Sequence, residues 1–352
     1  MSKENQLKDL LERFKTVIEG GTVPRPKVKY DTYAISNFRG GIGKSTLAFN
    51  LAWEISRTKK TLLIDACPQC NFTQSLLGED IAQYQHNIYD ALLPYVMPGT
   101  PNIALDDLVV SVPPWCGSFQ NGVGTYLVPG SKELFLFPSL LYTQLSASQN
   151  LGSRSEDTTK NILQAIHKII EKMREYLKTE KTLIDTSPFF GGATHLAWVA
   201  ADALIIPVRV DQHSMEALKL TLSMIKDTKM DFLRLNKQAG ITKVPKVHAI
   251  VMTHCGWNRQ TSYTPDRSTQ AYLAQVLDIA NENHELFSSD DPLDVIHLLD
   301  DFHSAGRISG TKRIPLAKLE VGSSYTIEGQ RLEVNVSLTR YQRELKSLAS
   351  TI

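Results

Sequence analysis

The sequence predicts an α/β fold in which helices cover both faces of a mostly parallel sheet. Short apolar runs alternate with longer amphipathic stretches along most of the chain. Two of the runs end in an acid, Asp65 and Asp185, as expected for buried parallel strands with polar tips. A glycine-rich turn also joins the first predicted strand to a helix. Ligands of such sheets bind at the carboxyl ends of the strands, so we expect a functional site there.

The N-terminal region is expected to form a helix and linker over residues 1–29, ahead of a main domain at 30–352. Apolar residues recur every three or four positions between residues 6 and 19, which predicts one apolar helix face. Gly20 and Gly21 end this helix, and Pro24 and Pro26 keep the next stretch extended. The apolar face either packs on the main domain or contacts a partner or second copy.

Buried strands are expected at residues 33–36, 61–65, 125–131, 181–185, 203–208 and 247–253. One helix is expected over residues 158–177, and a last one begins near Leu338. The stretch around residues 281–310 is rich in acids. Charged segments of this kind are mostly solvated, so we expect an acidic insertion there, with a partner site as the alternative.

Bulk composition is typical of a soluble globular chain. Of its 352 residues, 42% are hydrophobic and 21% are charged. The net charge of +1 gives no overall attraction to nucleic acid or membrane, so DNA binding would need a local basic patch. Four cysteines are too few for a disulfide scaffold. Neither a signal peptide nor a membrane-spanning run is evident, so we expect a cytoplasmic protein without membrane partners.

The glycine-rich turn has the features of a phosphate-binding loop. A turn between a strand and a helix directs several backbone N–H groups at one spot, where the helix dipole adds positive charge. The Lys44 ammonium can reach the outer phosphates, and the Ser45 hydroxyl can ligate Mg²⁺. We therefore expect a nucleoside triphosphate on a loop made of Gly40, Gly41, Ile42, Gly43, Lys44, Ser45 and Thr46.

The loop departs from the common G-x-x-x-x-G-K-[ST] pattern, because Phe38 occupies the position of its first glycine. A dinucleotide fingerprint is one alternative, since Gly41 and Gly43 give its first two glycines. However, Thr46 stands where its third glycine belongs, and that fingerprint has no role for Lys44. A helix cap that is merely glycine-rich is the remaining alternative.

Four stretches together resemble the ParA/MinD family of deviant Walker ATPases, and ParA-type partition ATPases most closely. The first is the loop from Arg39 to Thr46, and the second is residues 62–73, similar to the family's L-I-D-x-D-P-Q-x-N-x-T motif. The third, residues 183–188, is similar to its Walker B segment, and residues 200–208 are similar to the segment that follows. All four occur in the family's order over roughly residues 30–255, with a weaker C-terminal part around Pro315.

The resemblance implies a homodimer formed around two molecules of ATP with Mg²⁺. The basic residue before the glycines, here Arg39, would reach the phosphates of the other subunit. Lys44 would neutralise the outer phosphates, Ser45 and Asp185 would hold Mg²⁺, and Asp65 would orient the metal shell. Contacts to adenine would fall on residues 253–258, beginning with Thr253, and on Pro315.

One departure from the family bears on catalysis. The second acid of the D-x-D-P-Q motif, implicated in orienting the attacking water, is replaced by Cys67. A neutral thiol accepts hydrogen bonds poorly, so we expect binding and dimerisation with slow hydrolysis. Cys67 and Cys70 also form a C-x-x-C pair, which leaves redox chemistry or half of a zinc site as a lesser alternative.

Three functions remain open from the sequence. The first is a DNA-partition or cargo-positioning ATPase that binds DNA nonspecifically and is released by a regulating partner protein. Its basic patch would come from Arg340, Arg343 and Lys346, or from Lys219, Lys226 and Lys229. The second, a membrane-positioning ATPase, is disfavoured because the last helix has a narrow apolar stripe. The third is a slow, nucleotide-gated regulatory or scaffold subunit of a multi-protein system.

Overall fold

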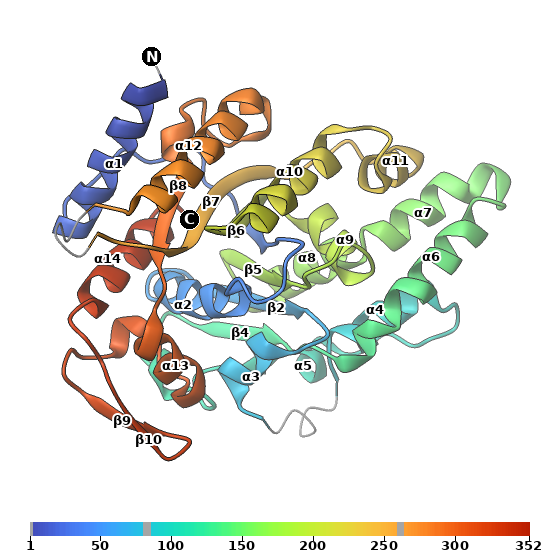
Figure 1. Ribbon diagram of the computed structural model, residues 1–352. Coiled ribbons are helices and arrows are strands. Elements are labelled where there is room, and N and C mark those ends of the chain that lie inside the picture. The colour runs from blue at the N-terminus through green and yellow to red at the C-terminus, as the bar shows by residue number, and fades with distance from the viewer. Residues whose placement is uncertain (1–2, 80–85, 259–263) are drawn as a thin grey trace.

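The computed structural model describes residues 3–79, 86–258 and 264–352. Its centre is a sheet of eight strands in the spatial order β3-β4-β2-β5-β1-β6-β7-β8 (Figure 1). Among the described strands of this sheet, β3 alone runs antiparallel to its neighbour. The strands are β1 (Thr32–Ile35), β2 (Thr61–Ala66), β3 (Val110–Ser111), β4 (Thr125–Val128), β5 (Lys181–Thr186), β6 (Ala203–Arg209), β7 (Lys246–Cys255) and β8 (Ile296–Asp300).

The two faces of the sheet form two separate hydrophobic cores. Alternate residues of each strand point to opposite faces, so Tyr33 and Ile35 of β1 enter one core and Ala34 enters the other. The first core is covered by α2 (Lys44–Ser56), α3 (Asn71–Leu77), α13 (His303–Lys312) and α14 (Leu338–Ala349). The expected α/β fold with helices on both faces is confirmed.

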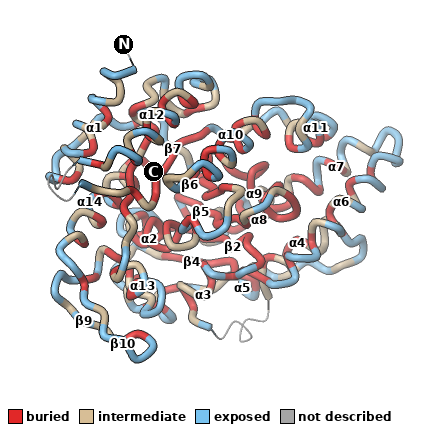
Figure 2. Tube along the Cα trace, viewed as in Figure 1, coloured by how far each residue is buried: buried red, intermediate tan, exposed pale blue. Residues whose placement is uncertain are grey.

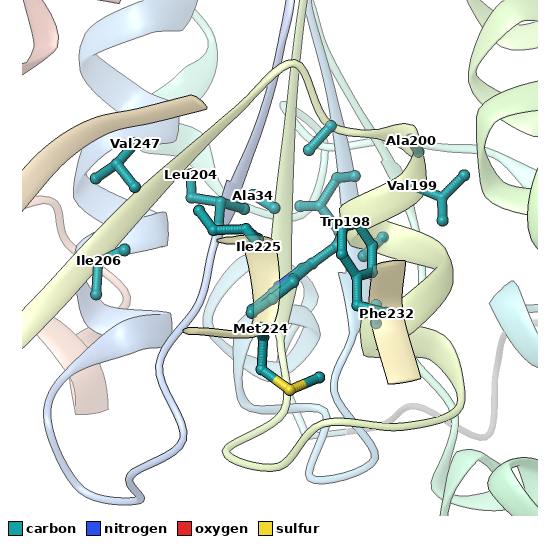
Figure 3. Close-up of a cluster of buried hydrophobic side chains, with 14 of the residues drawn as sticks. Ala34, Trp198, Val199, Ala200, Leu204, Ile206, Met224, Ile225, Phe232 and Val247 are labelled. Carbon is teal, nitrogen blue, oxygen red and sulfur yellow. The ribbon is translucent and has the colours of Figure 1, made fainter. Parts of the chain in front are cut away.

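The second core is the larger one and contains Trp198, which is fully buried (Figure 3). Figure 2 shows how the buried strands lie between helices whose outer sides are exposed. The helices on this side are α1 (Lys3–Glu19), α4 (Ile88–Val96), α5 (Leu105–Leu108), α6 (Phe137–Ser148), α7 (Ser155–Leu163), α8 (Ala165–Leu177), α9 (Ala193–Ala200), α10 (Gln212–Lys226), α11 (Asp231–Gln238) and α12 (Arg267–Glu282).

Helix α1 packs on the rest of the chain, against α12 and α14. Its residues Leu10, Phe14 and Ile18 are buried, which confirms the first of the two alternatives for its apolar face. Arg13 fixes the helix further by pairing with Asp291 and Asp294. The boundary between residues 29 and 30 stays a prediction.

Two expectations need correction. The helix predicted over residues 158–177 is divided at Gln164, whose ψ of 12° interrupts the helical backbone between α7 and α8. The stretch at 281–310 is not a solvated insertion as a whole, because it contains β8, which pairs with β7 in the main sheet. Leu293, Val295 and Leu298 are buried there, and their apolar character outweighs the charge of the surrounding acids.

Two cations of the last helix prove to be structural. The Arg340 guanidinium pairs with Asp300 at the end of β8 and lies 4.2 Å from the centre of the Trp257 ring. The Arg343 guanidinium donates to the Ile18 carbonyl oxygen and so ties α14 to α1. Both are therefore poor candidates for a DNA contact.

A hairpin that the sequence did not reveal lies before α14 and consists of β9 (Ser324–Ile327) and β10 (Gln330–Glu333). Within the described ranges, no helix has the length and apolar character that a membrane span requires.

Candidate functional site: a phosphate loop at the carboxyl edge of the sheet

The glycine loop leaves the carboxyl end of β1, between β5 and β6, and leads into α2. Gly41 and Gly43 have φ of 71° and 84°, values that side chains with a Cβ rarely adopt. A Cβ at either position, or at Gly40, would meet open space. The loop therefore needs glycine for its backbone, and the space in front of it is room for a ligand.

Gly43 is the N-cap of α2 and offers no side chain to the first-turn N–H groups. Unpaired N–H groups at a helix N-terminus, together with the helix dipole, form an anion site. The loop lines a cleft of about 990 Å³, which Ser45, Cys67, Gln69 and Thr186 also line. This arrangement fits a polyphosphate at the position that the sequence predicted.

Lys44 lies curled over the loop. Its ammonium donates to the carbonyl oxygens of Asn37, at 3.1 Å, and Arg39, at 2.8 Å. Burial lowers the pKa of Lys44, and the nearby Asp185 carboxylate opposes that shift. The ammonium is thus held beside the cleft by two carbonyl groups that phosphate oxygens can replace.

The Arg39 side chain has a partner that the sequence analysis did not name. Its guanidinium pairs with Asp211, which also caps α10 by accepting from the Ser214 N–H at 2.9 Å. Arg209 lies beside the same carboxylate, with Nε 3.7 Å from Oδ2. Arg39 must exchange this ion pair before it can contact a phosphate.

The Ser45 hydroxyl and the Asp185 carboxylate meet as predicted for a Mg²⁺ site. Ser45 Oγ donates to Asp185 Oδ2 at 2.6 Å. The second oxygen, Oδ1, is buried and has no hydrogen-bond partner within the described chain. Burial raises the pKa of Asp185 to about 8, and the Asp65 charge adds to that shift. A buried carboxylate with an unpartnered oxygen next to a hydroxyl has the donor set of a Mg²⁺ site.

Asp65 lies next to Asp185 in the register of β2 and β5, yet both of its carboxylate oxygens are already engaged. Oδ2 accepts from the Thr73 N–H at 2.8 Å and the Thr73 hydroxyl at 2.7 Å, and Oδ1 accepts from the Cys67 N–H at 3.1 Å. A Cβ at Gly130 would lie 2.8 Å from its Cγ. Asp65 therefore holds the loop between β2 and α3, rather than offering a free oxygen to a metal.

Cys67 lines the cleft, and its side chain is 3% exposed. Burial raises the pKa of this thiol to about 12, and the Asp185 and Asp65 charges add to the shift. Cys70 is also buried, and its sulfur lies 3.7 Å from the Pro68 carbonyl oxygen. Within the described residues, no group of three or more His, Cys, Asp or Glu side chains forms a metal cluster. The C-x-x-C pair therefore finds no further ligands there.

The far end of the cleft differs in part from the prediction. Thr253 lines it, and its buried hydroxyl has no partner among the described residues. Pro315 is buried and lies outside the lining; the Leu316 N–H that follows it donates to Asn50 Oδ1 at 2.8 Å. The lining also includes His254, residues 299–303 at the end of β8 and directly after it, and part of α13. Only pairing of β8 with β7 brings this segment to the site, so the sequence could not indicate it.

A protein-family model described as an AAA domain matches residues 30–239. The chain is 25% identical over 207 residues to the chromosome-partitioning ATPase Soj of Thermus thermophilus, covering 58% of this chain and 64% of that protein. It is 27% identical over 186 residues to the chromosome partitioning protein ParA of Caulobacter vibrioides, covering 53% and 58%. An uncharacterised Pseudomonas putida protein is 28% identical over 210 residues, covering 59% of this chain and 66% of its own length. The chain thus spans 58% to 66% of the length of these relatives.

Solved structures show the same fold at lower identity. The Cyanothece McdA–ATP complex superimposes with a TM-score of 0.62 at 17% identity, covering 91% of this chain and 95% of McdA. A Borrelia burgdorferi B31 protein assigned to plasmid partition, bound to AMPPNP, gives 0.52 at 18% identity, with 92% and 100% covered. The family match, the parallel sheet and the loop beside Asp185 agree: the chain belongs to the ParA/MinD family of P-loop ATPases.

Proposed function

We propose that this protein is an ATP-dependent switch that dimerises around Mg-ATP, acts in DNA partition or positioning, and hydrolyses ATP slowly. The observation that carries the proposal is the buried Asp185 carboxylate, with one oxygen on Ser45 and the other unpartnered, beside an open glycine loop. Solved relatives that contain ATP or AMPPNP support the choice of nucleotide.

In this scheme the loop N–H groups and Lys44 would hold the outer phosphates. Ser45 and Asp185 would hold Mg²⁺, and the metal would neutralise the charge that develops on the phosphates. Arg39 leaves Asp211 to contact phosphate across the dimer interface. Thr253, which lines the same cleft, is the proposed contact to the base. A regulating partner protein is expected to control the cycle.

Slow hydrolysis follows from the chemistry at Cys67. Phosphoryl transfer depends on placing the attacking water and on stabilising charge. A buried thiol whose pKa is raised to about 12 stays neutral at physiological pH, so it neither takes a proton nor fixes water by charge. The attack of water, which the family's aspartate assists, therefore has no general base at this position.

Gel filtration of the full chain tests the switch. Mg-ATP should shift the protein from monomer to dimer, whereas ADP should not. The Lys44→Ala variant, which lacks the ammonium at the phosphates, is the control and should stay monomeric. An elution volume that is the same with and without Mg-ATP would overturn the proposal.

The Cys67→Asp variant tests the rate. Restoring a carboxylate at this position should raise ATP turnover by about 100-fold or more, the contribution of one general base. Cys67→Ser, which restores no charge, is the matched control and should hydrolyse ATP at the wild-type rate. Equal rates for wild type and Cys67→Asp would contradict the assigned role of this position.

A regulatory or scaffold subunit with little ATPase activity is the second candidate. The neutral Cys67 thiol and the engaged Arg39 side chain both favour it. The two candidates differ in DNA binding: a partition ATPase binds DNA as the ATP dimer, whereas a scaffold dimer leaves DNA free.

A further inference from the structure

We infer that the edge of the sheet opposite the nucleotide cleft is the DNA-binding surface of this protein. The inference rests on the proposed function and adds the surface to it. The amino edge, as we call it, comprises residues 27–31, 57–61, 174–181, 202 and 243–246, where the chain enters β1, β2, β5, β6 and β7.

Hydrogen bonds join these segments into one continuous row. The Glu180 N–H donates to the Lys60 carbonyl oxygen at 2.7 Å, and the Thr182 N–H to that of Asp31 at 2.8 Å. The Asp202 N–H donates to the Thr32 carbonyl oxygen at 2.9 Å, and the Lys246 N–H to that of Asp202 at 3.0 Å. Segments up to 170 residues apart in sequence are thus joined directly and lie side by side.

The amino edge is far more basic than the chain as a whole. It carries ten Lys and Arg residues and four Asp and Glu residues, a net charge of +6, against +1 for all 352 residues. The remainder of the chain is therefore net acidic. This separation of positive from negative charge attracts a polyanion to one side of the molecule. The net charge of the whole chain does not reveal this attraction.

Most of these cations have no acidic partner. Within the described residues, three ion pairs involve them: Lys59 with Glu180, Arg174 with Asp31, and Lys243 with Asp202. The other seven form no ion pair there: Lys27, Lys29, Arg57, Lys60, Lys178, Lys181 and Lys246. Three of the seven donate to carbonyl oxygens instead: Lys29 to Ser350, Lys246 to Glu285, and Lys181, which is buried, to Tyr30. Lys29, Lys59, Arg174 and Asp31 lie close enough to Lys181 to perturb its pKa, which burial chiefly lowers.

Helix dipoles explain only part of this charge. Arg57 and Lys178 cap the C-termini of α2 and α8, where cations are stabilising. Lys27, Lys29 and Lys243 lie in extended connections, and Lys246 begins β7. Lys29, Lys243 and Lys246 donate to carbonyl oxygens there, so the charge available to a ligand comes chiefly from Lys27, Lys60 and Lys178.

The shape of the edge favours duplex DNA. Five neighbouring strands at a spacing of about 4.8 Å spread the cations over roughly 19 Å, so they do not converge on one small anion. Duplex DNA offers one negative charge per ~1.7 Å along its axis and can contact the whole row. A membrane surface would require an amphipathic helix. The edge consists chiefly of connections and strand ends, with only the last turn of α8, and within the described chain Val28 and Tyr176 are its exposed large apolar residues.

The position of the edge also suits a switch. The nucleotide cleft lies at the opposite ends of the same strands, so ATP and DNA do not compete for space. A dimer that closes over the two clefts leaves both amino edges exposed. Two edges on one particle bind a long duplex, or two duplexes, more tightly than one edge does.

The test compares two triple variants of the full chain in fluorescence anisotropy with a labelled duplex of random sequence and Mg-ATP. The edge variant is Lys27→Gln, Lys60→Gln and Lys178→Asn; Asn is used because residue 178 has φ of 55°. The control, with the same change of charge, is Lys219→Gln, Lys226→Gln and Lys229→Gln, the other set that the sequence offered for DNA. Gel filtration with Mg-ATP confirms that both variants still dimerise.

The edge variant should bind DNA about 100-fold more weakly at about 100 mM salt, with the slope of log K against log salt reduced by about three. The control variant should match the wild type. Equal weakening in both variants, or weakening in the control alone, would overturn the inference. The inference would also be overturned if the wild-type dimer did not bind DNA at low salt, or if it bound anionic vesicles through these lysines instead. Those outcomes leave the switch intact, whereas loss of the Mg-ATP dimer contradicts the proposed function.

Discussion

The tips of β2 and β5 carry the same signal in the sequence and have different roles in the structure. Each is a buried apolar strand that ends in an acid, and Asp65 and Asp185 lie opposite each other in the register. Asp65 accepts three hydrogen bonds from its own loop, whereas Asp185 has one partner and one free oxygen. The comparison teaches that the neighbours of a buried carboxylate decide whether it stabilises a loop or is available to a metal.

Replacing Asp65 should have the largest effect on stability. Asp65→Ala removes the acceptor of two N–H groups and a hydroxyl, all buried, so we expect a loss of about 3 kcal/mol or more in the free energy of unfolding. Urea denaturation without nucleotide measures it. If the variant unfolds like the wild type, Asp65 does not hold the loop, and the contrast with Asp185 fails.

Asp185→Asn should act on metal binding instead. The amide keeps the shape and the contact with Ser45 but loses the charge, so affinity for Mg-ATP should fall about 10- to 100-fold, with much less effect on ATP without Mg²⁺. Isothermal titration calorimetry with and without Mg²⁺ separates the two. Asp65→Asn is the matched change on the neighbouring strand. An equal loss of Mg²⁺ dependence in both variants would show that the two acids share the metal.

Thr73→Val sharpens the role of the β2 loop. The substitution keeps the side-chain shape but removes the hydroxyl, which donates to Asp65 and accepts from the Gly130 N–H at 2.8 Å. We expect a loss of about 1–2 kcal/mol in the free energy of unfolding, with Mg-ATP affinity preserved when the folded protein is saturated. Denaturation of Thr73→Ser, which retains the hydroxyl, should give a smaller loss. Equal losses for Val and Ser would assign the effect to packing.

The last effect is a pH dependence. The folded state raises the pKa of Asp185 to about 8 and that of Asp65 to about 6. A carboxyl with a raised pKa binds more protons in the folded than in the unfolded chain, so its contribution to stability falls as pH rises from about 4 towards 8. Glu344 has a raised pKa as well, and the buried histidines His195 and His248 have lowered ones and act oppositely below pH 6.5.

The difference in stability between wild type and Asp185→Asn isolates one group from this mixture. With increasing pH the wild type should lose stability relative to the variant, most steeply around pH 6, about midway between the ordinary and the raised pKa of Asp185. Thermal unfolding of the nucleotide-free proteins between pH 5 and pH 8 measures the trend. A constant difference would mean that Asp185 titrates alike in the folded and unfolded chain.

Local patterns were enough to predict much of the carboxyl edge. The glycines before Lys44, the apolar strands and the acids at their tips predicted the sheet and the loop, and the family resemblance implied that Ser45 and Asp185 lie together. These features are short in range, or follow from the rule that parallel strands end at the same edge. The same reasoning could not find the partner of Arg39, because Asp211 lies 172 positions away.

Longer-range features failed for the same reason. The acid-rich stretch around β8 was expected to be solvated, and it forms part of the sheet because a run of mostly apolar, buried residues lies between its acids. Arg340 and Arg343 were expected at a surface, and the tertiary structure engages them with Asp300 and the Ile18 carbonyl.

By itself the sequence determined the α/β class, the phosphate loop and the substitution of Cys67, since each depends on residues adjacent in the chain. Only the tertiary structure decided which acid remains free and where positive charge gathers. The carboxylate of Asp65 is satisfied by a turn, and the amino edge unites five segments that are distant in sequence. Hydrogen-bond saturation and surface charge depend on distances in space, which a linear pattern does not contain.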